Sequence, residues 1–407
     1  MSADSASPAP QPSSADQATP DRRRRMVRLS WAAGLAAVAL AVPAGAYAIA
    51  GGFAGNSGNP VNAPQHAAGF KAGQRFTLKH AAAAKNGKNA KNAKNASAAT
   101  TGTGYTAYVA AAGGFEVVAF DTATDTILKT YSADTPEGVA VTPDGSQMFI
   151  AETGQYHVIA TNLATGAQTP IFVGPYPQDV AVSPDGSQVY AAVTGGDTGP
   201  GGSDVVAVIS TATDKVTRDI KVGAGPRQVV FSPDGSRAYV STESGIAVIS
   251  TSAGTVVGHI SVPAGAQSVA VSPNGKTLYV TSPAANALLI INATTGRVTR
   301  RVSAGQEPYG VAVTPDGAQA YVTDLNANQV TVVKTANGSV TGTVAVGRQP
   351  ASVAVTPDGS QVWVGNILDG DITVIDPATN TVSGTLLQGV GTANFQAAPL
   401  GIAFAKQ

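Results

Sequence analysis

The stretch Val353-Ala354-Val355-Thr356-Pro357-Asp358-Gly359 decides the fold of this 407-residue chain, because it joins a short apolar strand to a tight turn. In such a turn, proline presets φ, the Asp side chain bonds to the local backbone and glycine takes a positive φ. An aromatic residue, Trp363, stands in the strand that follows. The stretch predicts a β-hairpin with near-continuous apolar strands, which are typical of sheets covered on both faces.

The same turn occurs six times along the chain. Its prolines are separated by 41, 49, 40, 42 and 42 residues. Each hairpin, made of the apolar strand, the turn and the aromatic strand, is followed by a third strand and a more polar fourth strand. A period of about 40 to 45 residues is that of a four-stranded propeller blade. The turns are Thr142-Pro143-Asp144-Gly145, Ser183-Pro184-Asp185-Gly186, Ser232-Pro233-Asp234-Gly235, Ser272-Pro273-Asn274-Gly275, Thr314-Pro315-Asp316-Gly317 and Thr356-Pro357-Asp358-Gly359.

A seventh blade is divided between the two ends of the repeat region. Residues 105–133 contain an aromatic strand around Tyr108 and two later strands, but no first strand. Pro399-Leu400-Gly401-Ile402-Ala403-Phe404 copies the first strand of the preceding repeat. We therefore expect residues 105–407 to form an all-β, seven-bladed propeller of four-stranded antiparallel blades, closed by pairing of the terminal strands.

The repeat resembles the YVTN β-propeller repeat, also described as YncE-like. The segments Leu278-Tyr279-Val280-Thr281 and Ala320-Tyr321-Val322-Thr323-Asp324 carry the resemblance, which covers residues 105–407. It implies the fold and no particular activity. Similar propellers include surface-layer proteins, periplasmic proteins, lactonase-like proteins and the haem d1 domain of cytochrome cd1 nitrite reductases.

The amino-terminal region has the pattern of a membrane-targeting address. Residues 1–28 form a polar segment that ends in a basic cluster, for which we expect disorder or the role of a signal n-region. Residues 29–50 are uncharged and apolar, and basic residues before an apolar run are typical of export. This segment is either a signal peptide, cleaved after Ala46-Tyr47-Ala48, or a membrane anchor. Both alternatives predict that the propeller lies outside the cytoplasm, either secreted or anchored to the membrane at the cell envelope.

Residues 51–104 predict a flexible linker rich in Ala, Asn and Lys. Seven basic residues and no acidic residue lie between Lys71 and Lys94. The first 104 residues hold 12 Lys/Arg against 3 Asp/Glu, whereas the remainder holds 13 against 22, so the two parts carry +9 and −9. The linker is either a solvated spacer or an electrostatic contact to anionic cell-wall polymer or lipid.

A candidate ligand site follows from the repeat geometry. The residues two positions before the first Val or Ile of each innermost strand should surround the mouth of the central channel, together with polar loop residues such as Glu152, Asp324 and Asp371. This ring is chemically uneven, which suits a small molecule or a peptide; the alternative is a water-filled channel with solvated loop residues. The predicted ligand-binding residues are Glu137, Gln178, Arg227, Gln267, Glu307 and Tyr309.

Composition argues against most other functions. The chain has no cysteine and 4 histidines, and no Ser or Cys nucleophile has a motif nearby, so we predict no catalytic site, cofactor or metal. Asp197 and Asp204 in the longest insertion are too few for a hard-cation site. Because the propeller is acidic, we predict that it binds no specific nucleic acid, and we expect it to be a monomer. The resulting hypothesis is a noncatalytic binding or scaffold module; the alternatives are a lactonase-like or lyase-like enzyme and a purely structural surface protein.

Overall fold

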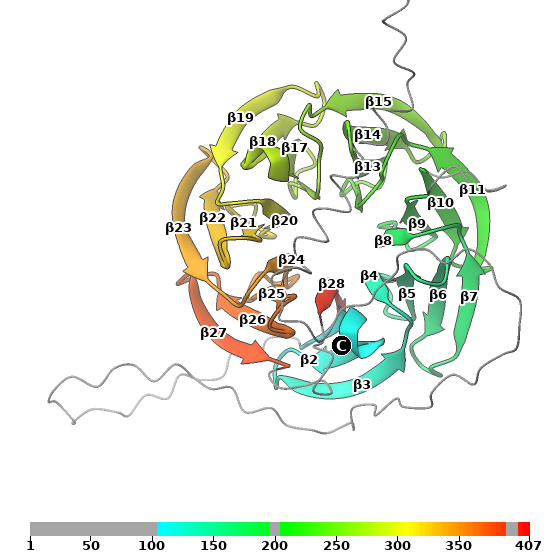
Figure 1. Ribbon diagram of the computed structural model, residues 1–407. Coiled ribbons are helices and arrows are strands. Elements are labelled where there is room, and N and C mark those ends of the chain that lie inside the picture. The colour runs from blue at the N-terminus through cyan, green and yellow to red at the C-terminus, as the bar shows by residue number, and fades with distance from the viewer. Residues whose placement is uncertain (1–103, 196–203, 388–397) are drawn as a thin grey trace, which may run out of the picture. The chain divides into compact units, whose positions relative to one another are not determined.

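The computed structural model describes residues 104–195, 204–387 and 398–407. Seven four-stranded antiparallel sheets surround a central channel (Figure 1), which confirms the predicted seven-bladed propeller. The predicted segments 1–28, 29–50 and almost all of 51–104 lie outside the described residues. Within the described ranges, no helix has the length and apolar character needed to cross a membrane.

Each blade has four strands, ordered from the channel outward. The innermost strands are β4 (Pro136–Val141), β8 (Pro177–Val182), β12 (Val229–Phe231), β16 (Val269–Val271), β20 (Pro308–Val313), β24 (Pro350–Val355) and β28 (Pro399–Lys406). The second strands are β1 (Tyr105–Ala111), β5 (Gln147–Glu152), β9 (Gln188–Val193), β13 (Arg237–Thr242), β17 (Thr277–Ser282), β21 (Gln319–Asp324) and β25 (Val362–Asn366).

The two outer strands of each blade complete the sheets. The third strands are β2 (Glu116–Asp121), β6 (His157–Asn162), β10 (Val205–Ser210), β14 (Gly245–Ser250), β18 (Ala287–Asn292), β22 (Gln329–Lys334) and β26 (Asp371–Asp376). The fourth strands are β3 (Thr126–Ser132), β7 (Gln168–Phe172), β11 (Lys215–Lys221), β15 (Thr255–Ser261), β19 (Val298–Ser303), β23 (Ser339–Ala345) and β27 (Thr381–Leu386). Two short 3₁₀ turns, η1 (Ala112–Gly114) and η2 (Pro283–Ala285), follow β1 and β17.

We number the blades 1 to 6 from β4 to β27, and blade 7 contains both ends of the propeller. Strand β28 pairs antiparallel with β1, with Ala403 opposite Tyr108 and Ile402 opposite Val109. Figure 1 shows β28, in red, beside the cyan strands of the same blade. The predicted closure by the terminal strands is therefore confirmed.

The repeated turns and aromatic residues play the predicted structural roles. In every turn the glycine N–H donates to the carbonyl three residues earlier, as from Gly359 to Thr356 at 2.8 Å, with φ of 72° at Gly359. The aromatic residues of the second strands are buried between neighbouring blades. Trp363 of blade 6, for example, packs edge-to-face against Phe404 of blade 7 at 5.7 Å between ring centroids. Fourth strands such as β19 are mostly exposed, as their polar sequence predicts.

The threonine of the YVT sequence ties one blade to the next. In blade 5, the Thr323 hydroxyl accepts the N–H of Gly310 at 2.7 Å and donates to the carbonyl of Ala351 in blade 6 at 3.3 Å. Thr281 makes the equivalent bond from blade 4 to the Tyr309 carbonyl at 2.6 Å. Repetition of this short motif therefore positions each innermost strand relative to the preceding blade.

Candidate channel-mouth site

The predicted site residues lie where the innermost strands begin. Glu137, Gln178 and Tyr309 are the second residues of β4, β8 and β20, and Arg227 and Gln267 stand two residues before β12 and β16. All five are partly exposed. Because these strands surround the channel (Figure 1), the five residues lie around one mouth of it, on the face that carries the loops between blades. We call this set, together with Asp179, the channel-mouth cluster.

A fixed guanidinium occupies one side of the cluster. Arg227 Nη1 donates to Gln267 Oε1 at 2.5 Å, so a residue of blade 4 positions the cation of blade 3. Burial lowers the pKa of Arg227 from its usual value, and negative charge on Tyr309 and Glu243 opposes that effect. The guanidinium remains charged, since its unperturbed pKa lies far above neutrality.

Two carboxylates occupy another side. The pKa of Glu137 is raised to about 7, mainly by burial; the nearby Thr153 hydroxyl lowers it and the Asp179 carboxylate raises it by smaller amounts. Burial likewise raises the pKa of Asp179 to about 7, against the lowering effect of the N–H groups of Val229 and Val180. Blades 1 and 2 therefore place two carboxyl groups near each other, and each of these groups gains or loses its proton near neutral pH.

Tyr309 connects the two sides electrostatically. Its pKa is raised first by burial and then by Glu137, is lowered by Arg227, and is raised by Glu307. Glu137, Arg227 and Tyr309 belong to blades 1, 3 and 5, so these influences act across the channel. The structure thus brings three of the predicted site residues into one electrostatic environment.

The other two predicted residues have different surroundings. Gln178 Nε2 lies 3.5 Å from the Tyr176 carbonyl, a long and weak hydrogen bond. Glu307 lies in the loop before β20 with φ of 56°, and its carboxylate accepts a 2.5 Å hydrogen bond from Asn326 Nδ2. Gln178 thus lies in the cluster with its hydrogen bond directed to its own loop, and Glu307 borders the cluster and acts on Tyr309 through its charge.

The structure adds one residue to the prediction and removes others. Asp179 was missed, because the predicted ring included only the residue before it. Asp324, Glu152 and Asp371 were expected in loops around the mouth, and this expectation was wrong, since all three are buried within their blades. Asp324 is 0% exposed, and its Oδ2 accepts hydrogen bonds from Thr331 at 2.6 Å and Gln329 at 3.1 Å. Asp324 therefore stabilises the hairpin formed by β21 and β22 in blade 5 and is not accessible to a ligand.

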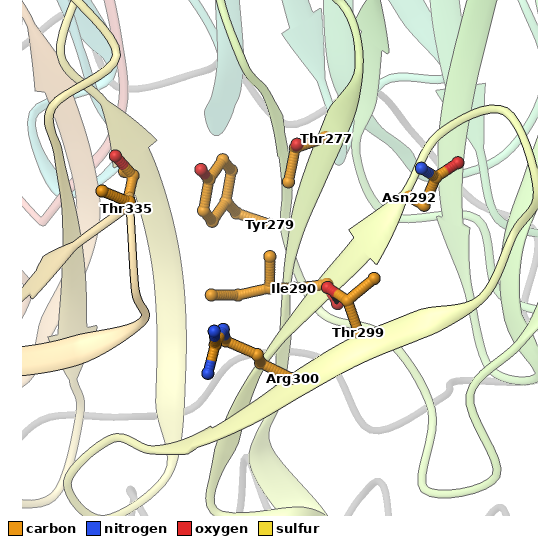
Figure 2. A pocket seen from close by; sticks show the side chains of 8 residues that line it. Thr277, Tyr279, Ile290, Asn292, Thr299, Arg300 and Thr335 are labelled. Carbon is orange, nitrogen blue, oxygen red and sulfur yellow. Dashed lines mark hydrogen bonds between the residues drawn. The ribbon is translucent and has the colours of Figure 1, made fainter.

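A second hollow, of about 200 Å³, lies away from the mouth at the seam between blades 4 and 5. Figure 2 shows the side chains around it, which come from β17, β18, β19 and the turn after β22. The hollow exists because Thr277 stands where Gln319 and Gln361 of the next two blades bond to Tyr321 and Trp363. The lining residues are Thr277, Tyr279, Ile290, Asn292, Thr299, Arg300, Thr335 and Ala336.

The propeller histidines lie apart from the cluster. His259 is exposed on β15, at the outer rim where the sequence placed it. His157 begins β6 and packs edge-to-face against Phe172, with the ring centroids 6.0 Å apart. Within the described ranges, no group of three His, Cys, Asp or Glu side chains is arranged to hold a metal ion.

Comparison with solved structures supports the fold. The chain is 23% identical to a chain of hydrazine synthase from Kuenenia stuttgartiensis, covering 67% of this chain and 92% of that one, with a TM-score of 0.63. A protein of unknown function from Desulfotomaculum acetoxidans has 15% identity, coverage of 74% and 98%, and a TM-score of 0.61. A candidate 6-phosphogluconolactonase from Bacteroides uniformis has 16% identity, coverage of 75% and 100%, and a TM-score of 0.61.

These identities are low enough that the three structures establish the fold alone. No curated protein matches the sequence. A family model described as the YNCE-like beta-propeller matches residues 115–319, which is half of the chain and six of its blades in whole or in part. This match includes the YVT segment of blade 4 and ends directly before that of blade 5. The chain belongs to the YNCE-like β-propeller family.

Proposed function

We propose that the propeller is a noncatalytic binding module that takes a small polar ligand or the end of a peptide at the channel-mouth cluster. The convergence of Glu137, Arg227 and Tyr309 from three blades carries this proposal. Partial burial of ionisable groups opposes folding unless partners compensate it. The inter-blade bonds of Thr281 and Thr323 already hold the blades together, so a ligand is the simplest use for the charged groups.

The charges suggest what the ligand offers. The carboxyl groups of Glu137 and Asp179 would accept hydrogen bonds or pair with a positive group, and the Arg227 guanidinium would bind a carboxylate or another anion. A ligand with both kinds of group satisfies both sides of the cluster. Together with the amino-terminal address, this makes the protein an exported ligand-binding propeller held at the cell envelope.

The test is retention of ligand by the full chain and by a variant with Glu137, Arg227, Glu307 and Tyr309 all replaced by alanine. The purified proteins are used to capture metabolites and peptides from an envelope extract, followed by mass spectrometry. We expect the variant to retain no ligand above background. A control variant carries Lys215→Ala, Lys276→Ala and Lys334→Ala, far from the mouth, and should retain the ligand. Retention by the quadruple variant would rule out the channel mouth.

A lactonase-like or lyase-like activity is the second candidate. The observation in its favour is the pair Glu137 and Asp179, whose pKa values of about 7 suit acid–base chemistry at neutral pH. The likeness to a candidate lactonase adds only the shared fold. Hydrolysis of a panel of lactones by the full chain, abolished by Glu137→Gln, would replace the binding proposal with this one.

A further inference from the structure

The loops of blades 2, 4 and 5 share a hydrogen-bonding pattern. The residue that directly precedes the third strand has a left-handed backbone, and its side chain accepts the N–H of a residue in the next blade-crossing loop. Asn286 Oδ1 accepts from Glu307 at 2.9 Å, Asn328 Oδ1 from Gln349 at 3.0 Å, and Asp204 Oδ1 from Gly225 at 3.0 Å. Asn and Asp suit both tasks, since they tolerate positive φ and carry a short acceptor.

Blade 1 breaks this rule with two tyrosines. Tyr156 takes the position before the third strand with φ of 63°, and Tyr176 takes the crossing-loop position with φ of 51°. A tyrosine ring cannot supply the acceptor; instead the two rings pack edge-to-face with centroids 5.9 Å apart. The rings remain largely in solvent, with exposures of 43% and 49%.

The positive φ belongs to the repeat, since Asn328 and Gln349 at the equivalent positions of blade 5 and the loop after it share it, but the repeat does not require aromatic side chains there. Bulky side chains at positive φ are rare and strained, and exposed aromatic surface adds no stability. Strain of this kind concentrates at functional sites. Blade 7 repeats the pattern, since Phe115 stands at the position of Tyr156 with φ of 55° and an exposure of 48%. Two adjacent blades therefore present aromatic rings where blades 2, 4 and 5 carry Asp or Asn.

Charge identifies the kind of partner. Between Lys129 and Lys215 the sequence contains no Lys or Arg and nine acidic residues. At the loop end of blade 1, Asp134 accepts a hydrogen bond from Gln155, the neighbour of Tyr156, and Glu152 Oε1 accepts the Asp134 N–H at 2.7 Å. Of these nine, Asp134 and Glu152 stand at the loop end of blade 1, Glu137 and Asp179 belong to the channel-mouth cluster, and Asp144, Asp185 and Asp214 stand in turns at the opposite end of their blades.

We propose that the loop end of blade 1, with Tyr156 and Tyr176 at its centre, is a docking surface for an extended, arginine- or lysine-bearing peptide segment of a partner protein. Guanidinium and ammonium groups stack on tyrosine faces and pair with carboxylates, so this combination complements a cationic segment. Exposed tyrosines beside acidic groups are also the composition of binding hot spots. The inference goes beyond the channel-mouth proposal, and either proposal can fail without the other.

The test uses the full chain and a fluorescent decapeptide of alternating Arg and Ala, measured by anisotropy at low and at physiological salt. The key variant combines Tyr156→Asn, the residue type of blades 4 and 5, with Tyr176→Gly, the residue type of Gly225 after blade 2. We expect it to melt at the same or a higher temperature than the wild type, and to bind the peptide at least tenfold more weakly. All variants keep the same linker, so its positive charge affects each measurement equally.

Controls separate this surface from others. Val257→Ala and Val340→Ala remove exposed apolar groups from outer strands and should leave binding unchanged, as should Glu137→Gln combined with Arg227→Ala at the channel mouth. A matched peptide of alternating Glu and Ala, whose electrostatic partner is the cationic linker, should bind wild type and the double tyrosine variant equally. Unchanged affinity in the double tyrosine variant overturns the proposal. Loss of binding to a neutral polysaccharide in that variant, with no wild-type affinity for the cationic peptide, also overturns it and assigns the surface to glycans.

Discussion

The carboxylate of Asp179 in blade 2 accepts the backbone N–H of Val229 in blade 3 at 3.1 Å. The same position in the next blades makes the same kind of bond, since Gln228 Oε1 accepts the Val269 N–H at 2.8 Å and Ser268 Oγ accepts the Val311 N–H at 3.3 Å. Asp179 is thus a structural acceptor between blades and also an ionisable member of the channel-mouth cluster. These two roles make the fold sensitive to pH at this residue.

Replacement of Asp179 by asparagine should stabilise the propeller above neutral pH. The folded pKa of about 7 exceeds that of an unfolded aspartate, so the folded state holds a proton that the unfolded state releases. Folding stability from this proton is present below pH ~4 and is lost as pH rises through about 7. Asparagine retains the acceptor oxygen without the charge. We expect its free energy of unfolding to exceed that of wild type by about 1–3 kcal/mol at pH 8.

Denaturant unfolding at pH 5 and pH 8 measures this difference. Asp144→Asn is the matched control, because hydrogen bonds from Thr142 and Ser146 lower the pKa of the exposed Asp144. That variant should be less stable than wild type at both pH 5 and pH 8, because the stabilisation from a lowered pKa is lost only below pH ~4. Identical pH profiles for wild type and Asp179→Asn would contradict the raised pKa.

The buried threonine of the YVT sequence should contribute to stability through its hydroxyl. Thr323→Val keeps the shape of the side chain but removes the bonds to Gly310 and Ala351, leaving a buried N–H without its acceptor. We expect a loss of about 1–3 kcal/mol in the free energy of unfolding. Thr341→Val on the outer strand β23 is the control, since its single hydroxyl bond reaches the Val332 carbonyl beside solvent and should cost under about 1 kcal/mol. Equal effects would show that the inter-blade bond has no special role.

Closure of the ring predicts a large effect of the carboxyl-terminal strand. Phe404→Ala removes a ring that packs against Trp363 and should cost about 2–4 kcal/mol. Deletion of residues 399–407 leaves the edge of β1 unpaired and should lower the melting temperature by more than 10 °C or prevent folding. Thermal denaturation followed by circular dichroism distinguishes these outcomes. A truncated chain that melts with the full chain would exclude blade 7 as the closing element.

The sequence predicted the fold almost completely, because each repeat states its own turn and strand boundaries. The turn at Gly359, the buried Trp363 and the pairing of Ile402 with Val109 all followed from local chemistry and the period. For these three features, the position of each residue within the repeat was sufficient to predict the structure. The surroundings of Asp324 were not predictable in this way, since only the three-dimensional packing of β21 against β22 shows that its side chain points inward.

The candidate site was partly predictable for the same reason. Counting two residues back from the first Val or Ile of each innermost strand found Glu137, Arg227 and Tyr309. Asp179, which directly follows Gln178, was missed because only that one position of each blade was counted. Comparing the residues before each third strand would have separated Tyr156 from Asn286 and Asn328. The raised pKa values could not be predicted, because they depend on burial that residues from several blades create together.

The Lys-rich linker carries a last prediction, which tests how the protein stays at the envelope. Replacing Lys85, Lys88, Lys91 and Lys94 by glutamine removes four of the seven positive charges between Lys71 and Lys94. If the linker contacts anionic polymer or lipid, each charge near such a surface contributes on the order of 1 kcal/mol, so the variant should move from the envelope to the soluble fraction. Quantitative immunoblotting of fractionated cells measures this shift, and high salt should release the wild type in the same way. A variant that fractionates like the wild type at every salt concentration would leave the linker as a spacer, and retention would then depend on residues 29–50.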